Sequence, residues 1–271
     1  MVKQKQKQKE PFSTKKLLNI GFYAKKSHRV IDGGDCLLQP EEFTEITEIF
    51  RSWIHDNNIT VYSESTNIGL IRHIYLRKAF ATGEIMVCVV INGVSIPESD
   101  ALLSELQKIN GFKTLVLNIN RESTNVVLGK ECKAIFGDGY IEDILCGYRF
   151  RISPKSFYQV NPVQTEKLYR KALEFADLNG TETVLDAYCG TGTIGIIASD
   201  KAGKVIGVEL NADAVKDAKE NAKRNSVKNI QFYQNDAGKF LMEMAEQKAE
   251  VDVVLMDPPR AGSSEEFLQS V

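Results

Sequence analysis

The sequence predicts an α/β protein in which a smaller α+β domain with antiparallel strands precedes a doubly wound parallel sheet. From residue 155 onward, short apolar strands alternate with helices, which is typical of a parallel sheet flanked by helices. Before residue 155, several short strand patterns are separated by Gly and Asn turns. A length of 271 residues suits two domains of roughly 100–200 residues each. We expect domains over residues 17–154 and 155–271, preceded by a basic, disordered tail over residues 1–16.

The first domain is expected to contain two helices and six strands. Apolar residues recur at helical spacing after Pro40 and predict an amphipathic helix; they are Phe43, Ile46, Phe50 and Ile54. A second helix is expected from about residue 98 to residue 110, with Gly111 as its stop signal. The expected strands span residues 70–80, 85–92, 114–119, 125–128, 140–145 and 148–152.

The second domain is expected to begin with a helix. Asn161 followed by Pro162 is a favourable pair for a helix start, and the helix should reach about residue 178. The expected strands then span residues 183–186, 204–209, 229–234 and 251–257. The helices between them are expected over residues 193–199, 213–225 and 237–247.

The composition is that of an ordinary globular protein. Apolar residues make up 43% and charged residues 26%, which excludes collagen-like, disulfide-scaffold and mostly disordered chains. The longest apolar runs, residues 85–91 and 251–256, are too short to span a bilayer, which needs about 20 residues. Five cysteines at scattered positions favour a reducing compartment. We expect a cytoplasmic protein without a membrane partner, and no obligate protein partner is implied.

The net charge of −2 conceals an uneven distribution. Residues 1–16 carry six Lys and one Glu, whereas the remaining chain has a net charge of −7. This distribution excludes a broad basic surface for nucleic acid. Any polyanionic partner must therefore be met by local basic patches, such as Arg149, Arg151 and Lys155.

A glycine-rich turn between a strand and a helix carries the strongest functional signal. Gly190, Gly192 and Gly195 follow the predicted strand that ends at residue 186, and together they satisfy G-x-G-x-x-G. Glycines allow close approach of a ligand to the backbone, and a helix N-terminus offers unpaired N–H groups. Glu209 ends the next strand, where a carboxylate can accept hydrogen bonds from ribose hydroxyls. Both features suit a dinucleotide or an adenosyl cofactor equally well.

Two further carboxylates favour the adenosyl cofactor. Asp186 ends the strand before the glycine turn, where it can pair with a positively charged group. Such a position suits a sulfonium-bearing amino acid better than a pyrophosphate. The segment Asp257-Pro-Pro-Arg260 closes the last predicted strand, at the sheet edge where ligands bind in this architecture. The two prolines fix the backbone there.

The order of these motifs resembles the RNA uracil-5-methyltransferase family, whose members use S-adenosylmethionine to make 5-methyluridine in ribosomal or transfer RNA. The segments that carry the resemblance are Ser156-Phe-Tyr-Gln-Val-Asn161, Asp186-Ala-Tyr-Cys-Gly-Thr-Gly192, Val205-Ile-Gly-Val-Glu209 and Asp257-Pro-Pro-Arg260. Weaker matches upstream extend it over nearly everything after the tail. The resemblance implies a class I, Rossmann-like methyltransferase fold with S-adenosylmethionine as cofactor. It also implies an RNA substrate, which we expect to be 23S ribosomal RNA rather than transfer RNA.

The resemblance also implies roles for individual residues. The family's cofactor-site positions are matched by Gln159, Tyr188, Glu209 and Asp257, with Gly190, Asp186 and Asp236 placed near the cofactor by their position on the sheet. An amide such as that of Gln159 can bind both the carboxylate and the amine of a methionine moiety. Phe157 matches a position near the target base, and we expect Arg260 on the substrate side as well.

The family's catalytic pair is not found in the sequence. The resemblance implies a cysteine in a Ser-Cys-Asn-Pro segment, which attacks carbon 6 of uracil, and a carboxylate that later removes the carbon 5 proton. No such segment occurs, and only 11 residues follow Arg260. We therefore expect a fragment that is inactive alone, with the nucleophile beyond Val271. Cys189 lies near a helix N-terminus that can lower its pKa, but the resemblance assigns it to the cofactor loop.

No metal site is expected in this chain. In cluster-bearing members of the family, a cysteine at the place of Cys36 is the fourth ligand of a [4Fe–4S] cluster, and the other three come from an upstream segment that this sequence lacks. A cluster is therefore expected only in a full-length protein. Two alternative functions stay open at this point. They are an NAD-dependent oxidoreductase and a non-catalytic RNA-binding module built from residues 17–155.

Overall fold

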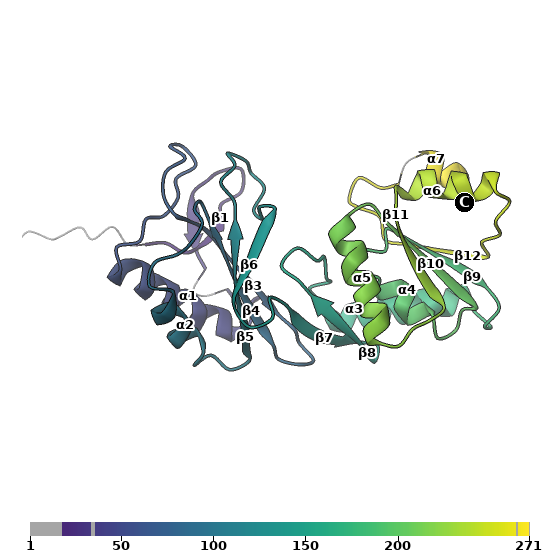
Figure 1. The fold of residues 1–271 in the computed structure, drawn as a ribbon, viewed down its shortest axis with the longest axis horizontal. Coiled ribbons are helices and arrows are strands. Elements are labelled where there is room, and N and C mark those ends of the chain that lie inside the picture. Colours follow the sequence, from purple (N-terminus) through teal and green to yellow (C-terminus); the bar gives the residue numbers. More distant parts are fainter. Residues whose placement is uncertain (1–17, 34–35, 264, 271) are drawn as a thin grey trace, which may run out of the picture. The chain divides into compact units, whose positions relative to one another are not determined.

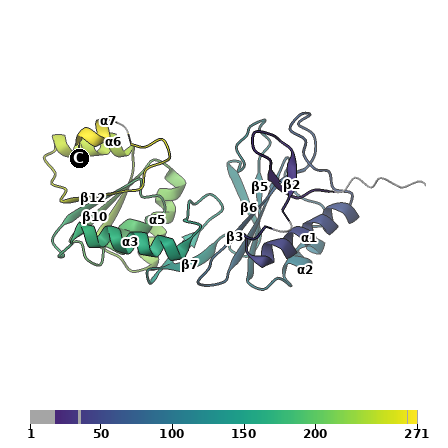
Figure 2. The same ribbon diagram turned by 180° about the vertical axis from the view of Figure 1, so that it is seen from behind.

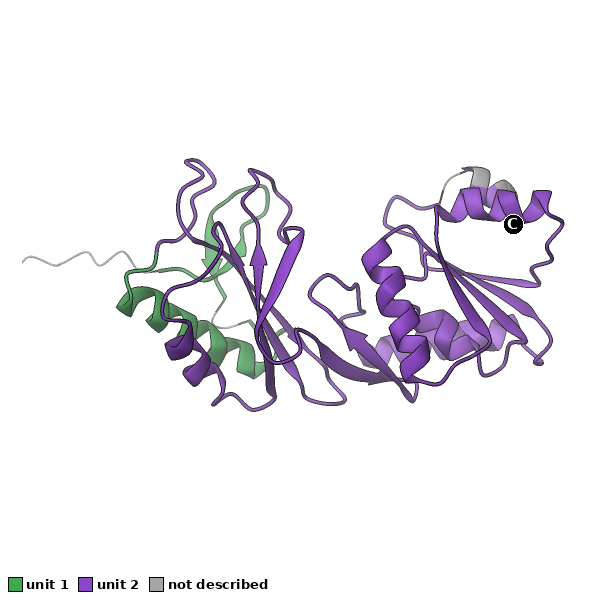
Figure 3. Cartoon of the chain, in the orientation of Figure 1, with its two compact units in different colours: residues 1–59 green, residues 60–271 purple. Residues whose placement is uncertain are grey.

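The computed structural model describes residues 18–33, 36–263 and 265–270. The chain forms two compact units, residues 1–59 and residues 60–271 (Figure 3). The predicted tail over residues 1–16 lies outside the described residues. The domain boundary near residue 155 stays a prediction.

The first unit contains a short hairpin and one helix. Strand β1 (Gly21–Tyr23) pairs antiparallel with β2 (Val30–Asp32). Helix α1 (Glu41–Asp56) follows, and its predicted apolar face is buried at Ile46, Phe50 and Ile54. The hairpin was not predicted, because its strands have only three residues each and most of their side chains are exposed.

The second unit begins with a four-stranded sheet in the order β3-β4-β5-β6. Its elements are β3 (Ile71–Lys78), β4 (Ile85–Ile91), α2 (Ser99–Leu106), β5 (Phe112–Ile119) and β6 (Glu131–Phe136). The outer pairs are antiparallel as expected, but β4 and β5 pair in parallel. The parallel pair arises because α2 carries the chain back to the same end of the sheet. All seven residues of β4 are buried, which is typical of a parallel strand covered on both faces.

The strand predicted over residues 125–128 is wrong. Those residues form a loop, and the fourth strand is β6. Asparagine side chains replace a strand ladder here. Nδ2 of Asn120 donates to the carbonyl oxygens of Val126 (2.8 Å) and Val127 (3.2 Å), and Oδ1 of Asn118 accepts from the Gly129 N–H (2.6 Å). The polar backbone of the loop is therefore satisfied without pairing to a neighbouring strand.

A hairpin and a capped helix lead into the parallel sheet. Strands β7 (Ile141–Leu145) and β8 (Tyr148–Ile152) pair antiparallel through a turn at Cys146 and Gly147, both with positive φ. Helix α3 (Pro162–Ala176) begins where it was predicted, and Oδ1 of Asn161 accepts from the Gln164 N–H at 3.1 Å.

The parallel sheet was predicted correctly. Its strands lie in the order β11-β10-β9-β12 and all pair in parallel (Figures 1 and 2). The elements are β9 (Thr183–Ala187), α4 (Thr193–Ala198), β10 (Lys204–Glu209), α5 (Ala212–Arg224), β11 (Ile230–Gln234), α6 (Ala237–Glu246), β12 (Val253–Met256) and α7 (Glu265–Ser270). The chain runs outward from β9 to β11 and then returns to the other side of β9. The carboxyl ends of β9 and β12 therefore flank the topological switch point, where ligands bind in such sheets.

Apolar clusters cover both faces of this sheet. On one face Ile196 and Ile197 of α4 pack with Val215 and Ala218 of α5. On the other face Leu241 of α6 lies in a second cluster with α7. Figures 1 and 2 show α6 and α7 together on their side of the sheet. Among the described residues, no helix is long and apolar enough to cross a membrane.

Candidate functional site

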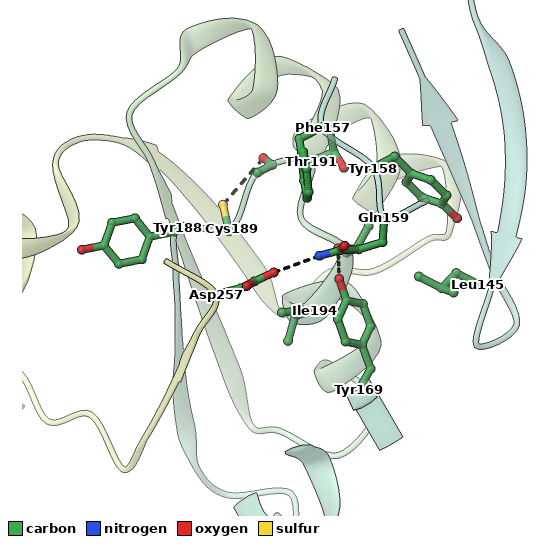
Figure 4. Close-up of a pocket in the computed structure, with 12 residues that line it drawn as sticks. Leu145, Phe157, Tyr158, Gln159, Tyr169, Tyr188, Cys189, Thr191, Ile194 and Asp257 are labelled. Carbon is green, nitrogen blue, oxygen red and sulfur yellow. Dashed lines mark hydrogen bonds between the residues drawn. The ribbon is translucent and has the colours of Figure 1, made fainter. Parts of the chain in front are cut away.

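A pocket lies at the carboxyl ends of β9 and β12 (Figure 4). Its wall combines the glycine loop after β9, the segment between β8 and α3, and residues of α3. The lining residues are Leu145, Phe157, Tyr158, Gln159, Tyr169, Tyr188, Cys189, Gly190, Thr191, Thr193, Ile194 and Asp257. Five of the predicted site residues therefore meet here, from segments up to about 100 positions apart.

The glycine loop depends on left-handed backbone conformations. Tyr188 has φ 62°, Gly190 has φ 54° and Gly192 has φ 80°. A Cβ at Gly192 would lie 2.7 Å from Cζ of Phe232, whereas a Cβ at Gly190 would meet nothing within 4 Å. The glycine at position 192 is thus required by both backbone conformation and packing.

Glu209 holds the glycine loop against the end of β10. Its Oε2 accepts from the Gly190 N–H at 3.1 Å, and its Oε1 accepts from the Asn211 N–H at 2.8 Å. The carboxylate therefore stands beside the loop, at the strand end where the sequence pattern placed it.

Asp186 is a buried carboxyl group with one unpartnered oxygen. Its Oδ2 accepts from the Gly195 N–H at 2.8 Å, while its Oδ1 is buried and has no hydrogen-bond partner among the described residues. Burial raises the pKa of Asp186 to about 7, the negative charges of Asp257 and Glu209 add to the rise, and the Gly195 hydrogen bond opposes it. The group therefore changes ionisation near neutral pH.

Asp186→Asn should change how stability depends on pH. A carboxyl whose folded pKa lies above its unfolded value, about 3.9, stabilises the fold fully below that value, and the contribution is lost as pH rises toward 7. The loss approaches 1.4 kcal/mol per pH unit within this window. Asparagine keeps an oxygen for the Gly195 N–H and does not ionise. Urea unfolding from pH 4 to pH 8 should therefore show a flatter profile for the variant, and equal profiles would contradict the raised pKa.

Gln159 and Asp257 form a polar pair inside the pocket. Nε2 of Gln159 donates to Oδ2 of Asp257 at 3.1 Å (Figure 4). The pair joins the segment before α3 to the segment after β12, which are 98 positions apart. Phe157 lies at the rim with 69% of its surface exposed, so its ring is available to a ligand.

A buried polar clamp fixes the chain just before Phe157. Oδ2 of Asp217, on α5, accepts from the hydroxyls of Ser153 (2.9 Å) and Ser156 (2.6 Å). From the other side, Nη1 of Arg77 on β3 donates to the carbonyl oxygens of Ser153 (2.8 Å) and Ser156 (2.5 Å). Sequence analysis missed this clamp. Its members lie far apart in the chain, and the only local signal was Ser156 at the start of the Phe-Tyr-Gln motif.

Asp217→Ala should destabilise the chain by about 2 kcal/mol, because it leaves the hydroxyls of Ser153 and Ser156 without their carboxylate acceptor and removes the negative charge that interacts with half-buried Arg77. Asp213→Ala on the same helix is the matched control. Asp213 is exposed and contacts only Lys155 at 3.5 Å, so its loss should cost less than 1 kcal/mol. Urea unfolding of both variants measures the difference, and equal effects would contradict the clamp.

Cys189 lacks the exposure and the lowered pKa that a nucleophilic cysteine needs. Its side chain is buried, with 6% exposed. Burial raises the pKa of the Cys189 thiol well above its usual value, and the nearby carboxylates of Asp186 and Glu209 raise it further. The thiol therefore stays protonated at neutral pH, although a helix begins four residues later.

Five predicted residues do not line the pocket: Asp186 and Glu209, described above, and Asp236, Arg260 and Cys36. Asp236 is exposed, and its Oδ1 caps α6 by accepting from the N–H groups of Gly238 (3.0 Å) and Lys239 (3.1 Å). Arg260 is exposed and does not line the pocket. Cys36 is half-buried, and within the described residues no three His, Cys, Asp or Glu side chains gather to hold a metal ion.

Two tyrosines line the pocket that sequence analysis did not single out. The Tyr169 hydroxyl pairs with Oγ1 of Thr193 at 3.1 Å, and burial raises the pKa of Tyr169 to about 12. The Tyr158 hydroxyl is buried with no hydrogen-bond partner among the described residues, and burial raises its pKa as well. Tyr158 stands inside the Phe-Tyr-Gln motif, whereas nothing in the sequence distinguishes Tyr169 from an ordinary core residue of α3.

The chain is similar to known methyltransferases. Residues 178–270 match a family described as a methyltransferase domain. A protein of Clostridium tetani, described as an uncharacterized RNA methyltransferase, is 43% identical over 94% of this chain and 55% of its own length. A protein of the same description from Caldanaerobacter subterraneus is 40% identical over 93% of this chain and 56% of its own length. The chain spans about half the length of the curated relatives it matches.

A solved structure agrees with the sequence comparisons. The tRNA (uracil-54, C5)-methyltransferase of Pyrococcus abyssi, solved in complex with S-adenosyl-L-homocysteine, superposes with a TM-score of 0.73 at 26% identity. The match covers 89% of this chain and 57% of that one. The chain has the fold of an S-adenosylmethionine-dependent methyltransferase. The predicted fold class is thereby confirmed, and the comparisons lend no support to an NAD-dependent oxidoreductase.

Proposed function

We propose that this chain is the cofactor-binding portion of an RNA uracil-5-methyltransferase, which transfers a methyl group from S-adenosylmethionine to carbon 5 of a uridine. The observation that carries the proposal is the hydrogen bond between Gln159 and Asp257. It brings the Phe-Tyr-Gln-Val-Asn element and the Asp-Pro-Pro-Arg element, the most specific parts of the resemblance, to one pocket beside the glycine loop.

The charges around the pocket fit an adenosyl cofactor. Asp257 lines the pocket, and Asp186 and Glu209 lie near it, since the charges of Asp257 and Glu209 raise the pKa of Asp186; no Lys, Arg or His is among the described lining residues. Such a site attracts a ligand with a sulfonium and an ammonium group and repels a pyrophosphate. Both carboxylate oxygens of Glu209 accept hydrogen bonds, from the N–H groups of Gly190 and Asn211. The same oxygens can accept hydrogen bonds from the two hydroxyls of a ribose. When bound, S-adenosylmethionine supplies an electrophilic methyl group.

The rim of the pocket fits an unstacked base. Phe157 lines the pocket and is 69% exposed. A pyrimidine turned out of its strand stacks favourably on an aromatic ring. We assign Phe157 to the base, Gln159 and Tyr188 to the cofactor, and Asp257 to the boundary between the two. Gly190 and Asp236 are assigned to the cofactor side and Arg260 to the RNA side.

The cysteine nucleophile is assigned to a part of the protein outside these 271 residues. In the proposed reaction, a thiolate adds to carbon 6 of uracil and forms a covalent adduct, and carbon 5 takes the methyl group. A carboxylate then removes the carbon 5 proton, and the cysteine leaves. The protonated, buried Cys189 is unsuited to the first step. We therefore expect the chain alone to bind S-adenosylhomocysteine without methylating RNA.

We propose a cytoplasmic RNA as the substrate, and 23S ribosomal RNA before transfer RNA. Deleting the gene and measuring 5-methyluridine by mass spectrometry, separately in ribosomal and transfer RNA, tests both statements. The proposal predicts loss of one 5-methyluridine from 23S ribosomal RNA and an unchanged level in transfer RNA. The reverse result would overturn the choice of RNA, and no change in either would overturn the uracil-5 assignment. A [4Fe–4S] cluster with Cys36 as one ligand stays a prediction for a longer protein.

A further inference from the structure

An open groove lies at the edge of the parallel sheet, away from the cofactor pocket. It is formed by the second half of α5, the turn that follows, and the edge strand β11, and its volume is about 720 Å³. The lining residues are Lys219, Ala222, Lys223, Ser226, Val227, Lys228, Ile230, Gln231, Phe232 and Tyr233. The cofactor pocket lies at the carboxyl ends of β9 and β12, so the two sites share no residue.

The groove is locally basic in a chain that is otherwise acidic. Lys219, Lys223 and Lys228 are exposed, and no Asp or Glu lines the groove with them. None of the three ammonium groups makes an ion pair or a hydrogen bond within the described part of the chain. The sequence after residue 16 carries a net charge of −7, so this concentration of free lysines is a local exception. It provides charge complementarity for a polyanion.

An aromatic side chain, Tyr233 of the edge strand β11, also lines the groove, and its ring packs on the face of the sheet opposite to α5. Tyr233 is 40% exposed, and one side of its ring packs on Phe240 with centroids 5.0 Å apart. Its hydroxyl pairs with Oε1 of Gln231 at 2.9 Å. The ring is therefore held in place by α6 and by its own strand, and its exposed part is available for stacking. Fixed aromatic rings beside free cations are typical of surfaces that bind single-stranded nucleic acid.

We propose that this groove binds a single-stranded segment of the RNA substrate, with the three lysines on backbone phosphates and Tyr233 beneath a base. This RNA segment does not contain the target uridine, because the groove is at the edge strand whereas the cofactor pocket is at the switch point. The inference rests on the proposed function in that the substrate is RNA. An acidic protein surface would satisfy the lysines but would make no use of the exposed ring.

The lysines can be tested by salt dependence. Fluorescence anisotropy with a labelled 20-nucleotide oligouridylate, repeated over a series of salt concentrations, gives the slope of log affinity against log salt. For K219Q/K223Q/K228Q the slope should become shallower by about 2, since each phosphate contact on a single strand contributes about 0.7. The matched control is K167Q/K201Q/K248Q, which removes the same charge from exposed lysines outside the groove. Equal slopes for the two triple variants would overturn the proposal.

The aromatic contact has a different signature. Y233L should weaken oligouridylate binding about fivefold or more and leave the salt slope unchanged, because stacking releases no counterions. Polyglutamate should bind the wild-type chain and Y233L equally, and tighter binding of polyglutamate than of oligouridylate would overturn the choice of RNA.

Calorimetric titration of S-adenosylhomocysteine separates this inference from the proposed function. All groove variants should bind it as the wild type does, because no groove residue lines the cofactor pocket. A wild-type chain that binds S-adenosylhomocysteine but no oligouridylate would overturn the groove and leave the cofactor role intact. Binding of oligouridylate without S-adenosylhomocysteine would contradict the proposed function alone.

Discussion

Glu209→Ala should weaken binding of S-adenosylhomocysteine by at least about 100-fold. The variant removes the two carboxylate oxygens that accept from the N–H groups of Gly190 and Asn211, and each charge-assisted hydrogen bond is worth about 1.5–3 kcal/mol. It also releases the Gly190 N–H, so the loop loses this contact with β10 and keeps its backbone hydrogen bond from the Cys189 N–H to the carbonyl oxygen of Val208. Isothermal titration calorimetry at constant pH and salt measures the affinity.

Glu220→Ala is the matched control for this substitution. Glu220 is an exposed glutamate of α5 that lies outside the pocket, so its loss should leave the affinity unchanged. Glu209→Gln keeps one oxygen for the Gly190 N–H and should fall between the wild type and the alanine variant. An affinity of Glu209→Ala within about threefold of the wild type would remove Glu209 from the cofactor site.

Gly192→Ala should lower the free energy of unfolding by about 2–5 kcal/mol. The residue at this position adopts φ 80°, which costs roughly 1–2 kcal/mol for a residue other than glycine. A Cβ would also lie 2.7 Å from Cζ and 2.9 Å from Cε1 of Phe232, and overpacking of a core adds about 1–3 kcal/mol. Urea unfolding measures the change.

Gly180→Ala separates the two contributions to this loss. Gly180 also has a positive φ, 102°, but a Cβ there would meet nothing within 4 Å. Its replacement should therefore cost only the backbone strain, about 1–2 kcal/mol. If Gly192→Ala were no more destabilising than Gly180→Ala, the contact between the glycine loop and Phe232 would not be as tight as described.

The second half of the fold was predictable because its signals are local. Short apolar strands, an Asn-Pro helix start and a glycine turn each occupy a few consecutive residues, and their order determines a parallel sheet. The first half of the fold was harder to predict, because the sequence of a strand does not show which other strand it pairs with. Nothing local indicates that β4 and β5 pair in parallel or that Asn118 and Asn120 bind the loop backbone over residues 126–129.

The sequence motifs indicated several residues of the candidate site, but not the burial and the neighbouring charges of those residues. The pocket unites Gln159, Tyr188 and Asp257 with the glycine loop, as the motif order indicated. The ionisation of Asp186 and Cys189 depends on burial and on neighbouring carboxylates, which no spacing shows. The clamp links Arg77 of β3 to Asp217 of α5 through the segment between β8 and α3. In the sequence alone, neither charged residue differs from one that is exposed to solvent.

We expect the pocket beside the glycine loop to bind an adenosyl amino acid rather than a dinucleotide. Calorimetric titration of the chain with S-adenosylhomocysteine and, separately, with NADH tests this expectation most directly. The carboxyl groups of Asp186, Glu209 and Asp257 attract the ammonium group of S-adenosylhomocysteine and repel the pyrophosphate of NADH, so we expect saturable binding of the former and no detectable heat with NADH. Tighter binding of NADH, or no binding of S-adenosylhomocysteine to a folded sample, would contradict the account.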